Sequence, residues 1–149
     1  MISRTSGYAL EALLAIARVE GTGMTRAARL AADLGIPANY LSKILNALVR
    51  AGILRSVRGP SGGFRLARPT ELVSILDAVK VFEETGSTRQ CMLGRGDCTD
   101  ENACPMHERW KAVSTPVFAY LRETTLADLI AAGSVGPSQG ATRKRAHPP

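Results

Sequence analysis

Residues 36–69 read IPANYLSKILNALVRAGILRSVRGPSGGFRLARP, and this stretch decides the fold of the 149-residue chain. Its first part carries leucines and isoleucines at helical spacing and stops at Gly52, a residue type that commonly ends helices. Its second part, residues 53–67, has two short strand-like runs on either side of a turn rich in glycine, proline and serine, which predicts a β-hairpin. The stretch therefore predicts a helix that is followed at once by a hairpin.

Two more helices are predicted upstream of this stretch. Residues 4–19 carry apolar side chains at helical spacing, and a shorter helix over 26–34 follows Thr25, which we expect to be its N-cap. The turn at 35–37 joins this second helix to the third, with Pro37 expected at the first helical position. Two short helices joined by a tight turn that contains glycine are typical of a helix-turn-helix. The sequence thus predicts a mainly α-helical protein whose first domain, residues 1–70, is a winged helix-turn-helix with a small β-hairpin wing.

The basic residues gather in the first half of the chain. Residues 1–70 contain ten Lys and Arg against three Asp and Glu, a net charge of +7, whereas residues 71–132 contain six against ten, a net charge of −4. A basic segment of this kind is typical of a surface that binds a polyanion such as DNA. A basic domain that is merely soluble has the same composition, so charge alone leaves both interpretations open.

The third predicted helix has two different faces. Four apolar side chains recur on one face and are expected to pack inward: Leu41, Ile44, Leu45 and Leu48. Short polar groups and one cation recur on the other face: Asn39, Ser42, Lys43 and Asn46. Asn and Lys bond base edges in the major groove and Ser bonds bases or phosphates, so we interpret this face as a DNA-reading surface. A solvated helix face without a function is the alternative.

The predicted hairpin turn adds cations and glycines to this surface. Arg58 projects from the tip region, where an arginine can enter a narrow minor groove, and Gly59 lets the backbone approach a phosphate chain closely. Arg55 and Arg65 flank the turn as predicted phosphate contacts. Turn chemistry alone explains the glycines but not the arginines. A nucleotide-binding loop is disfavoured because no Lys-Ser/Thr pair follows the glycines.

The rest of the chain divides into a linking segment, a candidate dimerisation segment and a tail. Residues 71–104 comprise a predicted amphipathic helix over 71–84 and a loop that holds every cysteine. Residues 105–132 comprise a long helix to about residue 122 and a short helix over 124–130. Residues 133–149 carry three basic groups and little apolar content, so we expect a disordered basic tail.

The long predicted helix has an apolar repeat close to that of a coiled-coil seam. Its apolar positions are Met106, Trp110, Val113, Val117 and Leu121, with Tyr120 as the alternative to the last of them. We therefore predict that this helix pairs with its counterpart in a second copy of the chain. Packing on its own domain is the alternative. Pro116 lies inside the helix and is expected to kink it or to remove a hydrogen bond.

All three cysteines lie in one polar loop, with the pattern Cys91-x6-Cys98-x5-Cys104-x2-His107. Three thiolates and one imidazole make four ligands, which suits either an iron–sulfur cluster or a zinc ion. His107 lies three residues after Cys104, so both side chains can point to one site. Zinc sites usually show paired C-x2-4-C knuckles, and this sequence has none. The same cysteines could also form a metal-free thiol switch or a set of inert buried thiols.

Three stretches together resemble the IscR/NsrR family of winged-helix regulators: SGYALEALLAIA at 6–17, the stretch at 36–69 and the cysteine run at 91–107. The resemblance covers roughly residues 2–130. It implies a homodimeric bacterial transcription regulator, rather than an enzyme, that binds a palindromic operator in double-stranded DNA. It also implies that the cysteine loop carries an iron–sulfur cluster that sets the DNA affinity, with the three cysteines and His107 as its ligands.

Two departures from the family pattern bear on the type of cluster. The first cysteine gap is six residues, one longer than is common in cluster-binding relatives, which a loop tolerates at little cost. Gly7 stands where some [4Fe-4S] relatives have an acidic ligand. Glycine has no ligand atom in a side chain, so [2Fe-2S] is favoured over [4Fe-4S]. Glu11, one helical turn further on, is a weaker candidate ligand.

Several classes of function are disfavoured by the sequence. It holds no apolar run of about eighteen residues, so we expect no membrane span. The N-terminus does not resemble a secretory signal, and we expect a cytoplasmic location, where clustered thiols are more often metal ligands or redox groups than disulfides. A thiol oxidoreductase would need a C-x-x-C pair or a cysteine with a separate histidine and acid. The alternative function is a DNA-binding regulator without a cluster, switched by thiol oxidation, zinc, a small molecule or a partner protein.

Overall fold

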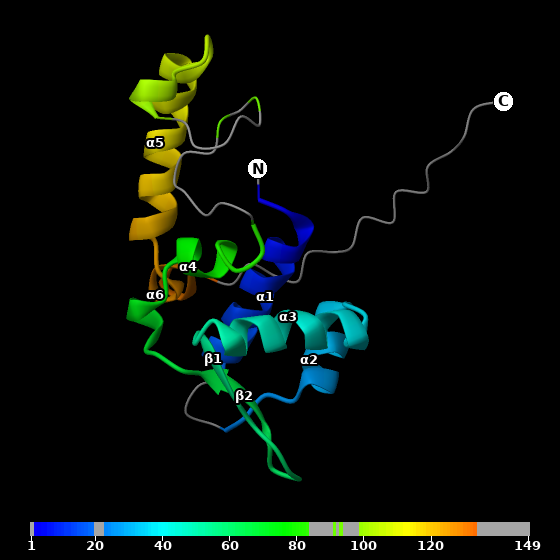
Figure 1. Ribbon diagram of the computed structural model, residues 1–149. Coiled ribbons are helices and arrows are strands. Elements are labelled where there is room, and N and C mark those ends of the chain that lie inside the picture. Colours follow the sequence, from blue (N-terminus) through cyan, green and yellow to red (C-terminus); the bar gives the residue numbers. More distant parts are fainter. Residues whose placement is uncertain (1, 20–22, 84–90, 92, 94–98, 134–149) are drawn as a thin grey trace, which may run out of the picture.

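The computed structural model describes residues 2–19, 23–83, 91, 93 and 99–133. The predictions for Cys98 and for nearly all of the basic tail lie outside the described residues. Figure 1 shows a mainly helical chain from which a β-hairpin extends at one end and a long helix at the other. The elements, in chain order, are α1 (Arg4–Arg18), α2 (Ala27–Leu34), α3 (Ala38–Arg50), β1 (Leu54–Val57), β2 (Gly63–Leu66), the 3₁₀ helix η1 (Thr70–Leu72), α4 (Ile75–Val79), the 3₁₀ helix η2 (Asp100–Asn102), α5 (His107–Glu123) and α6 (Leu126–Ala131).

The helix-turn-helix of α2 and α3 forms as the sequence predicts, and a glycine follows each helix. Gly35 after α2 has a φ of 64° and Gly52 after α3 has a φ of 71°, both in the left-handed region that glycine adopts without strain. Beyond α3, the amide of Ile53 donates to the carbonyl of Leu48 at 3.0 Å, which turns the chain back toward the core. Pro37 is the N-cap of α3 and so lies one position earlier than predicted.

The wing is an antiparallel pair of β1 and β2 whose register separates a buried face from an exposed one. Leu54 and Leu66 are Cα partners, and both are buried in the core. The next pair, Arg55 and Arg65, is exposed because successive side chains of a strand point to opposite faces. The register therefore fixes both arginines on the solvent side of the wing.

Thr25 pairs with the wing instead of capping α2, which corrects the prediction for this residue. Its amide donates to the carbonyl of Phe64 at 3.0 Å, and the Phe64 amide donates back to the carbonyl of Thr25 at 2.8 Å. Arg26 holds the N-cap position of α2 and makes no side-chain capping bond. A short window of sequence cannot predict this pairing, because the two paired segments lie far apart in the chain.

The main core surrounds α1, which contacts α3, α4, α6 and β2. Leu13 of α1, Leu45 of α3 and Leu126 of α6 are fully buried there. Burying side chains of this size contributes about 1.5–3 kcal/mol each. Helix α3, the wing and α6 therefore share one core.

The segment at 71–84 does not form the single amphipathic helix that its periodicity predicts. It consists of η1 followed by the short α4, and Leu72 is exposed. Between them the backbone pairs with the segment before α6: the amide of Leu126 donates to the carbonyl of Val73, and the amide of Ile75 donates to the carbonyl of Thr124, both at 2.9 Å. This long-range pairing draws the chain out of the helical conformation that local propensity favours.

The C-terminal half of α5 packs against α4 in a second, smaller core. Leu121 lies there with Ile75, Leu76 and Val79 of α4. Pro116 lies inside α5, and the helix nevertheless runs without a break from His107 to Glu123. The N-terminal half of α5 extends beyond this contact, away from the wing (Figure 1).

Glu83 joins the end of the α4 region to the start of α1. Its Oε1 accepts the amide of Ser3 at 2.7 Å and the hydroxyl of the buried Ser6 at 2.6 Å. The Ser3 and Ser6 hydrogen bonds hold the pKa of Glu83 below its ordinary value of 4.5. The carboxylate therefore stabilises the folded state whenever it is ionised.

Replacing Glu83 by glutamine is expected to lower the free energy of unfolding by about 1–2 kcal/mol at neutral pH, because charged hydrogen bonds are lost. A carboxyl whose pKa is lower in the folded state adds stability above its unfolded pKa, and this stability disappears as pH falls through the folded pKa. The difference between wild type and Glu83→Gln should therefore shrink below about pH 4.5 in urea unfolding. Glu71→Gln, at an exposed position, is the matched control. A pH-independent difference would contradict the role given to the charge.

Candidate nucleic-acid interface and cysteine centre

The predicted DNA-reading face of α3 is exposed as a continuous polar stripe. Asn39, Lys43 and Asn46 are exposed and Ser42 is half-buried, whereas the four apolar residues of the opposite face are buried. The Ser42 hydroxyl donates to the carbonyl of Ala38 at 2.8 Å, so its oxygen keeps acceptor capacity. Among the described residues, no hydrogen bond or ion pair holds the ends of Lys43 and Asn46. These two side chains can therefore reach an external partner.

Arg4, Thr5, Tyr8 and Tyr40 extend this surface, and sequence reasoning gave them no function. The Tyr40 hydroxyl and the Thr5 hydroxyl lie 2.6 Å apart, and the rings of Tyr40 and Tyr8 meet edge to face at 6.1 Å. The guanidinium of Arg4 donates to the Tyr8 hydroxyl at 2.8 Å. These contacts bring a cation at the start of α1 next to the start of α3. The available signal was the position of Tyr40, three residues before Lys43 on the polar face.

The wing presents its arginines to solvent around a tight turn. Gly59 has a φ of 112°, which side-chain-bearing residues rarely adopt. A Cβ on Gly62 would lie 2.2 Å from the carbonyl oxygen of Val57, so these two glycines are required by the turn itself. The guanidinium of Arg26 donates to the carbonyl of Pro60, which ties the tip of the wing to the start of α2.

The cations on the wing are close to one another. Arg58 is exposed near the tip, while Arg55 and Arg65 lie directly opposite each other on the two strands. Like charges at opposite positions of a strand pair repel. Together with Arg68, Arg55 and Arg65 line a cavity of about 710 Å³ beside the wing. An anion such as a DNA phosphate would relieve this repulsion.

Cys91 and Cys104 come together at the far end of α5 from the main core. Both are buried, at 7% and 9% exposure, and the indole of Trp110 packs against them. Their Sγ atoms lie 3.8 Å apart. Two thiolates on one tetrahedral metal ion, with metal–sulfur bonds near 2.3 Å, are separated by about 3.8 Å. The donor pair therefore fits a metal–thiolate site.

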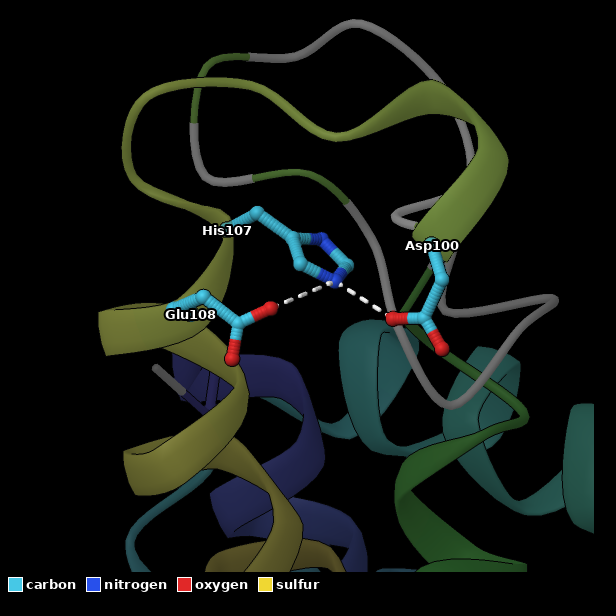
Figure 2. A group of neighbouring side chains, drawn as sticks. All are labelled: Asp100, His107 and Glu108. Atoms are coloured by element: carbon cyan, nitrogen blue, oxygen red, sulfur yellow. Dashed lines mark hydrogen bonds and ion pairs between the residues drawn. The ribbon is translucent and has the colours of Figure 1, made fainter.

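His107 is the first residue of α5, and its side chain is only 2% exposed. Its amide donates to the carbonyl of Cys104 at 2.9 Å, which ties the start of α5 to the cysteine loop. Its imidazole Nε2 lies 2.8 Å from Oδ1 of Asp100 and 3.8 Å from Oε1 of Glu108 (Figure 2). His107 thus follows Cys104 closely in the chain, and its ring bonds a carboxylate. Among the described residues, the ligand atoms that gather within 4.8 Å around its ring are those of Asp100 and Glu108, and no such group joins His107 to both thiols.

Lys111 completes this group, because its Nζ lies 2.8 Å from the same oxygen of Asp100. The hydrogen bonds from Lys111 and, to a smaller extent, from His107 lower the pKa of Asp100 from 3.8 to about 2. Sequence reasoning missed Asp100, Glu108 and Lys111. Lys111 lies one helical turn after His107, which was a usable signal, but the approach of Asp100 depends on how the loop folds back.

Asp100, His107 and Glu108 bring three potential ligand atoms within 4.8 Å of one another. This spacing suits a single divalent cation. However, the ammonium of Lys111 bonds the Asp100 oxygen that would face the ion, and its charge opposes a cation there. We therefore interpret the three residues as the surroundings of His107 rather than as a separate metal site.

The predicted dimerisation stripe on α5 is exposed for most of its length. Val113, Val117 and Tyr120 are 60%, 50% and 58% exposed, and Met106 is also exposed. Leu121 is 8% exposed and packs in the second core, so the prediction for this residue is corrected in favour of Tyr120. Trp110 lies partly buried against the cysteine pair. The stripe is an apolar surface for which the single chain supplies no cover among its described residues.

Comparison with known proteins identifies the family. A family model described as Rrf2, iron-dependent transcriptional regulator, matches residues 2–132. The chain belongs to the Rrf2 family. Its resemblance to IscR-type regulators is confirmed by the IscR of Vibrio vulnificus (strain YJ016), which is 30% identical over 128 residues that cover 86% of this chain and 76% of the relative.

Two solved structures share the fold of this Rrf2 protein. CymR, the global cysteine regulator of B. subtilis, matches with a TM-score of 0.77 and 26% identity, over 90% of this chain and 98% of CymR. The T. potens IscR matches with a TM-score of 0.73 and 24% identity, over 90% and 88% of the two chains. The predicted winged-helix fold is therefore confirmed.

The Rrf2 family makes this chain a DNA-binding transcription regulator rather than an enzyme. Within the described residues, no helix is both long and apolar enough to cross a membrane. The family description names iron, and the sequence of this Rrf2 protein predicts one set of metal ligands, three cysteines and a histidine, within residues 91–107.

Proposed function

We propose that this Rrf2 protein is a cytoplasmic, homodimeric transcription regulator, acting as a repressor, that binds a palindromic operator through α3 and the wing. The observation that carries the proposal is the exposed polar stripe of α3 beside the arginines of the wing, in a segment with a net charge of +7. A helix of this kind reads base edges in the major groove. Arg58 is assigned to the minor groove, and Arg55 and Arg65 are assigned to phosphates.

The dimer is assigned to the exposed stripe of α5. Val113, Val117 and Tyr120 recur at helical spacing along α5, and each is at least half exposed. A symmetric dimer presents two copies of α3 and the wing to half-sites about one turn of DNA apart. The two half-sites are then related by the same two-fold symmetry, which makes the operator palindromic.

The regulatory group is assigned to an iron–sulfur cluster held by Cys91, Cys98, Cys104 and His107, with [2Fe-2S] favoured over [4Fe-4S]. The 3.8 Å spacing of the two described sulfurs and the burial of His107 support this ligand set. Gly7 offers no ligand atom at the start of α1, which supports the smaller cluster. When bound, such a group supplies metal–thiolate bonds that respond to iron supply, redox stress or nitric oxide.

A series of contacts connects the cysteine loop to the winged domain. Cys104 and Asp100 hold the start of α5 through the amide of His107 and the side chains of His107 and Lys111. The other end of α5 packs on α4, which contacts α1 of the winged domain. Loss of the cluster frees the cysteine loop and changes how the two copies of α5 position the two winged domains on DNA. The coupling free energy between cluster binding and operator binding is expected to be about 1–3 kcal/mol.

A regulator without a cluster is the second candidate, and one observation favours it. Cys91 and Cys104 are both thiols, and their sulfurs lie 3.8 Å apart, so a movement of about 2 Å would bring them to disulfide distance. A thiol switch would fit the role that the B. subtilis relative has as a global cysteine regulator. Zinc, a small molecule or a partner protein would also serve as the signal of such a regulator.

Asn46→Ala is expected to weaken binding to the operator by about tenfold and to relax the preference for one base pair, since a base contact is worth about 1–3 kcal/mol. Lys43→Ala is expected to weaken binding to the operator and, because it removes a cation from the DNA-binding face, to reduce the slope of affinity against salt by about one. The measurement is a fluorescence titration at several salt concentrations, with a duplex selected by the wild-type protein from a random pool.

Lys80→Ala is the control, because it removes the same charge from an exposed position at the end of α4. It should leave both affinity and salt slope close to wild type. If Asn46→Ala and Lys43→Ala behave like this control, α3 is not the reading helix and the proposed interface is wrong.

A further inference from the structure

A cavity of about 710 Å³ lies beside the wing and has the size of a small-molecule site. Its charged lining residues are three arginines, Arg55, Arg65 and Arg68, and one acid, Glu71, so the lining carries a net charge of +2. The first two arginines lie on the strands of the wing, and Arg68 follows β2 closely. None of the described residues that line the cavity belongs to α2 or α3. The cavity is therefore separate from the polar stripe of α3.

The guanidinium groups of this cavity have no acidic partner in the part of the chain that the structure describes. Glu71 lines the same cavity, yet none of the ion pairs of the described residues joins it to an arginine. The Nε atom of Arg68 is buried and has no hydrogen-bond partner among the described residues. Buried polar groups nearly always have such a partner, so Arg68 lacks the acceptor that its surroundings would normally supply.

The arrangement of the three arginines favours a phosphate group over other anions. Arg55 and Arg65 are Cα partners on adjacent strands, where like charges repel unless an anion lies between them. A guanidinium is planar and binds the oxygens of an oxyanion through paired N–H groups. A carboxylate has two acceptor oxygens, whereas a phosphate group has three, so a phosphate group can accept from all three arginines at once.

We propose that the cavity beside the wing is a phosphate site, in which Arg68 holds a phosphate group together with Arg55 and Arg65. The phosphate group comes either from a free phosphate-bearing molecule or from the backbone of the operator. With the first source the cavity is an effector site. With the second, the inference rests on the proposed function and adds Arg68 to the contacts of the wing. In both cases the DNA-free protein binds inorganic phosphate at this cavity.

The first test titrates the whole chain, free of DNA, with inorganic phosphate that replaces sodium chloride at constant ionic strength. The readout is nitrogen-15 NMR of the arginine Nε–H groups. The signals of Arg55, Arg65 and Arg68 are expected to shift along one saturable binding curve. Arg109, which is exposed near the start of α5, should give an unshifted signal. Absence of a saturable shift in the three signals overturns the proposal.

Arg68→Met removes the guanidinium and keeps a long side chain that preserves the packing of the stem. It is expected to weaken phosphate binding by about tenfold or more, the effect of losing one charged hydrogen bond. Arg68→Lys keeps the charge without the planar fork and should lie between this variant and the wild type. Arg109→Met is the matched control and should bind phosphate like the wild type. If Arg68→Met weakens binding no more than this control, phosphate binds elsewhere and the proposal is wrong.

The second test separates the two sources of the phosphate group. Operator affinity is measured in phosphate and in chloride at the same ionic strength. If the operator backbone occupies the cavity, phosphate lowers the operator affinity of the wild type, and Arg68→Met reduces the slope of affinity against salt by about one. If a free molecule occupies the cavity, the salt slope of Arg68→Met equals that of the wild type. Either result, together with phosphate binding in the first test, supports the site and assigns its source.

Asn46→Ala distinguishes a failure of this inference from a failure of the proposed function. Asn46 lies on α3 and does not line the cavity, so this variant should bind inorganic phosphate like the wild type. If phosphate binding depends on Arg68 while Asn46→Ala and Lys43→Ala bind the operator like the wild type, the phosphate site stands and the proposed reading helix is wrong. If those two variants lose operator affinity but the DNA-free protein binds no phosphate, the proposed function stands and this inference falls.

Discussion

Replacing both Val113 and Val117 by aspartate is expected to give a folded monomer whose operator affinity is lower by about 10³-fold or more. Both side chains are at least half exposed in the single chain, so the new charges cost little in the folding of the monomer. In a dimer seam the same charges would be buried without partners, which costs several kcal/mol. The substitution therefore acts on association rather than on the fold.

The affinity falls because a monomer brings only one copy of α3 and the wing to the operator. A dimer gains contacts from two half-sites on one duplex, whereas a monomer binds only one of them. A protein binds its specific site about 10³–10⁷ times more tightly than non-specific DNA. Most of this difference in affinity disappears when half of the contacts are lost. Sedimentation equilibrium and operator titration at one fixed salt concentration measure the two effects on the same samples.

Ala112 and Thr115 provide a matched control on the same helix. Both are exposed on α5 and lie off the apolar stripe, so replacing both by aspartate adds the same charge to exposed positions of the same helix. This control should remain dimeric and bind the operator like the wild type. A dimer that survives Val113→Asp with Val117→Asp, or a monomer with unchanged affinity, would show that the interface lies elsewhere.

The winged helix was predictable because its signals are local. Apolar spacing, the glycines after α2 and α3, and the composition of the hairpin turn each act within a few residues of where they are found. The structure departs from the prediction where distant segments meet. Val73 pairs with Leu126 and Thr25 pairs with Phe64, and neither contact leaves a trace in a short window of sequence.

The candidate site was predictable to the same extent. The spacing of the cysteines and His107 predicts one centre; the structure brings Cys91 and Cys104 together, while Cys98 lies outside the described residues. The carboxylate on His107 was not predictable, because Asp100 reaches the ring only after the loop turns back to the start of α5. Likewise, the spacing at the end of the α5 stripe allowed either Tyr120 or Leu121, and only packing against α4 decides that Leu121 is buried.

Cys104→Ser is expected to abolish cluster binding and, with it, the regulation of operator affinity. The Cys104 sulfur is buried 3.8 Å from that of Cys91, and the Cys104 carbonyl accepts the amide of His107, so Cys104 lies between two other proposed ligands. A serine hydroxyl is a poor substitute for a soft thiolate. Anaerobically purified wild type should show visible charge-transfer bands with about two irons per chain, and the variant should be colourless.

Operator affinity gives the second measurement. In the wild type, loaded and metal-free protein should differ by about 5–150-fold at one salt concentration, the range that corresponds to a coupling of about 1–3 kcal/mol. Cys104→Ser should have the affinity of the metal-free wild type and should not respond to reconstitution. Ala103→Ser is the control, because it adds a hydroxyl at the neighbouring exposed position and should keep both colour and response.

The same pair of measurements separates the cluster from zinc and from a thiol switch. About four irons per chain in the wild type would keep the sensor but replace [2Fe-2S] by the larger cluster. A colourless wild type that binds one zinc would assign the same ligands to a structural metal. A metal-free wild type whose affinity changes with an oxidant, and a Cys104→Ser variant that ignores the oxidant, would make the Cys91–Cys104 pair a thiol switch. Since the two sulfurs lie close enough for either chemistry, the metal content of the wild type is what decides between them.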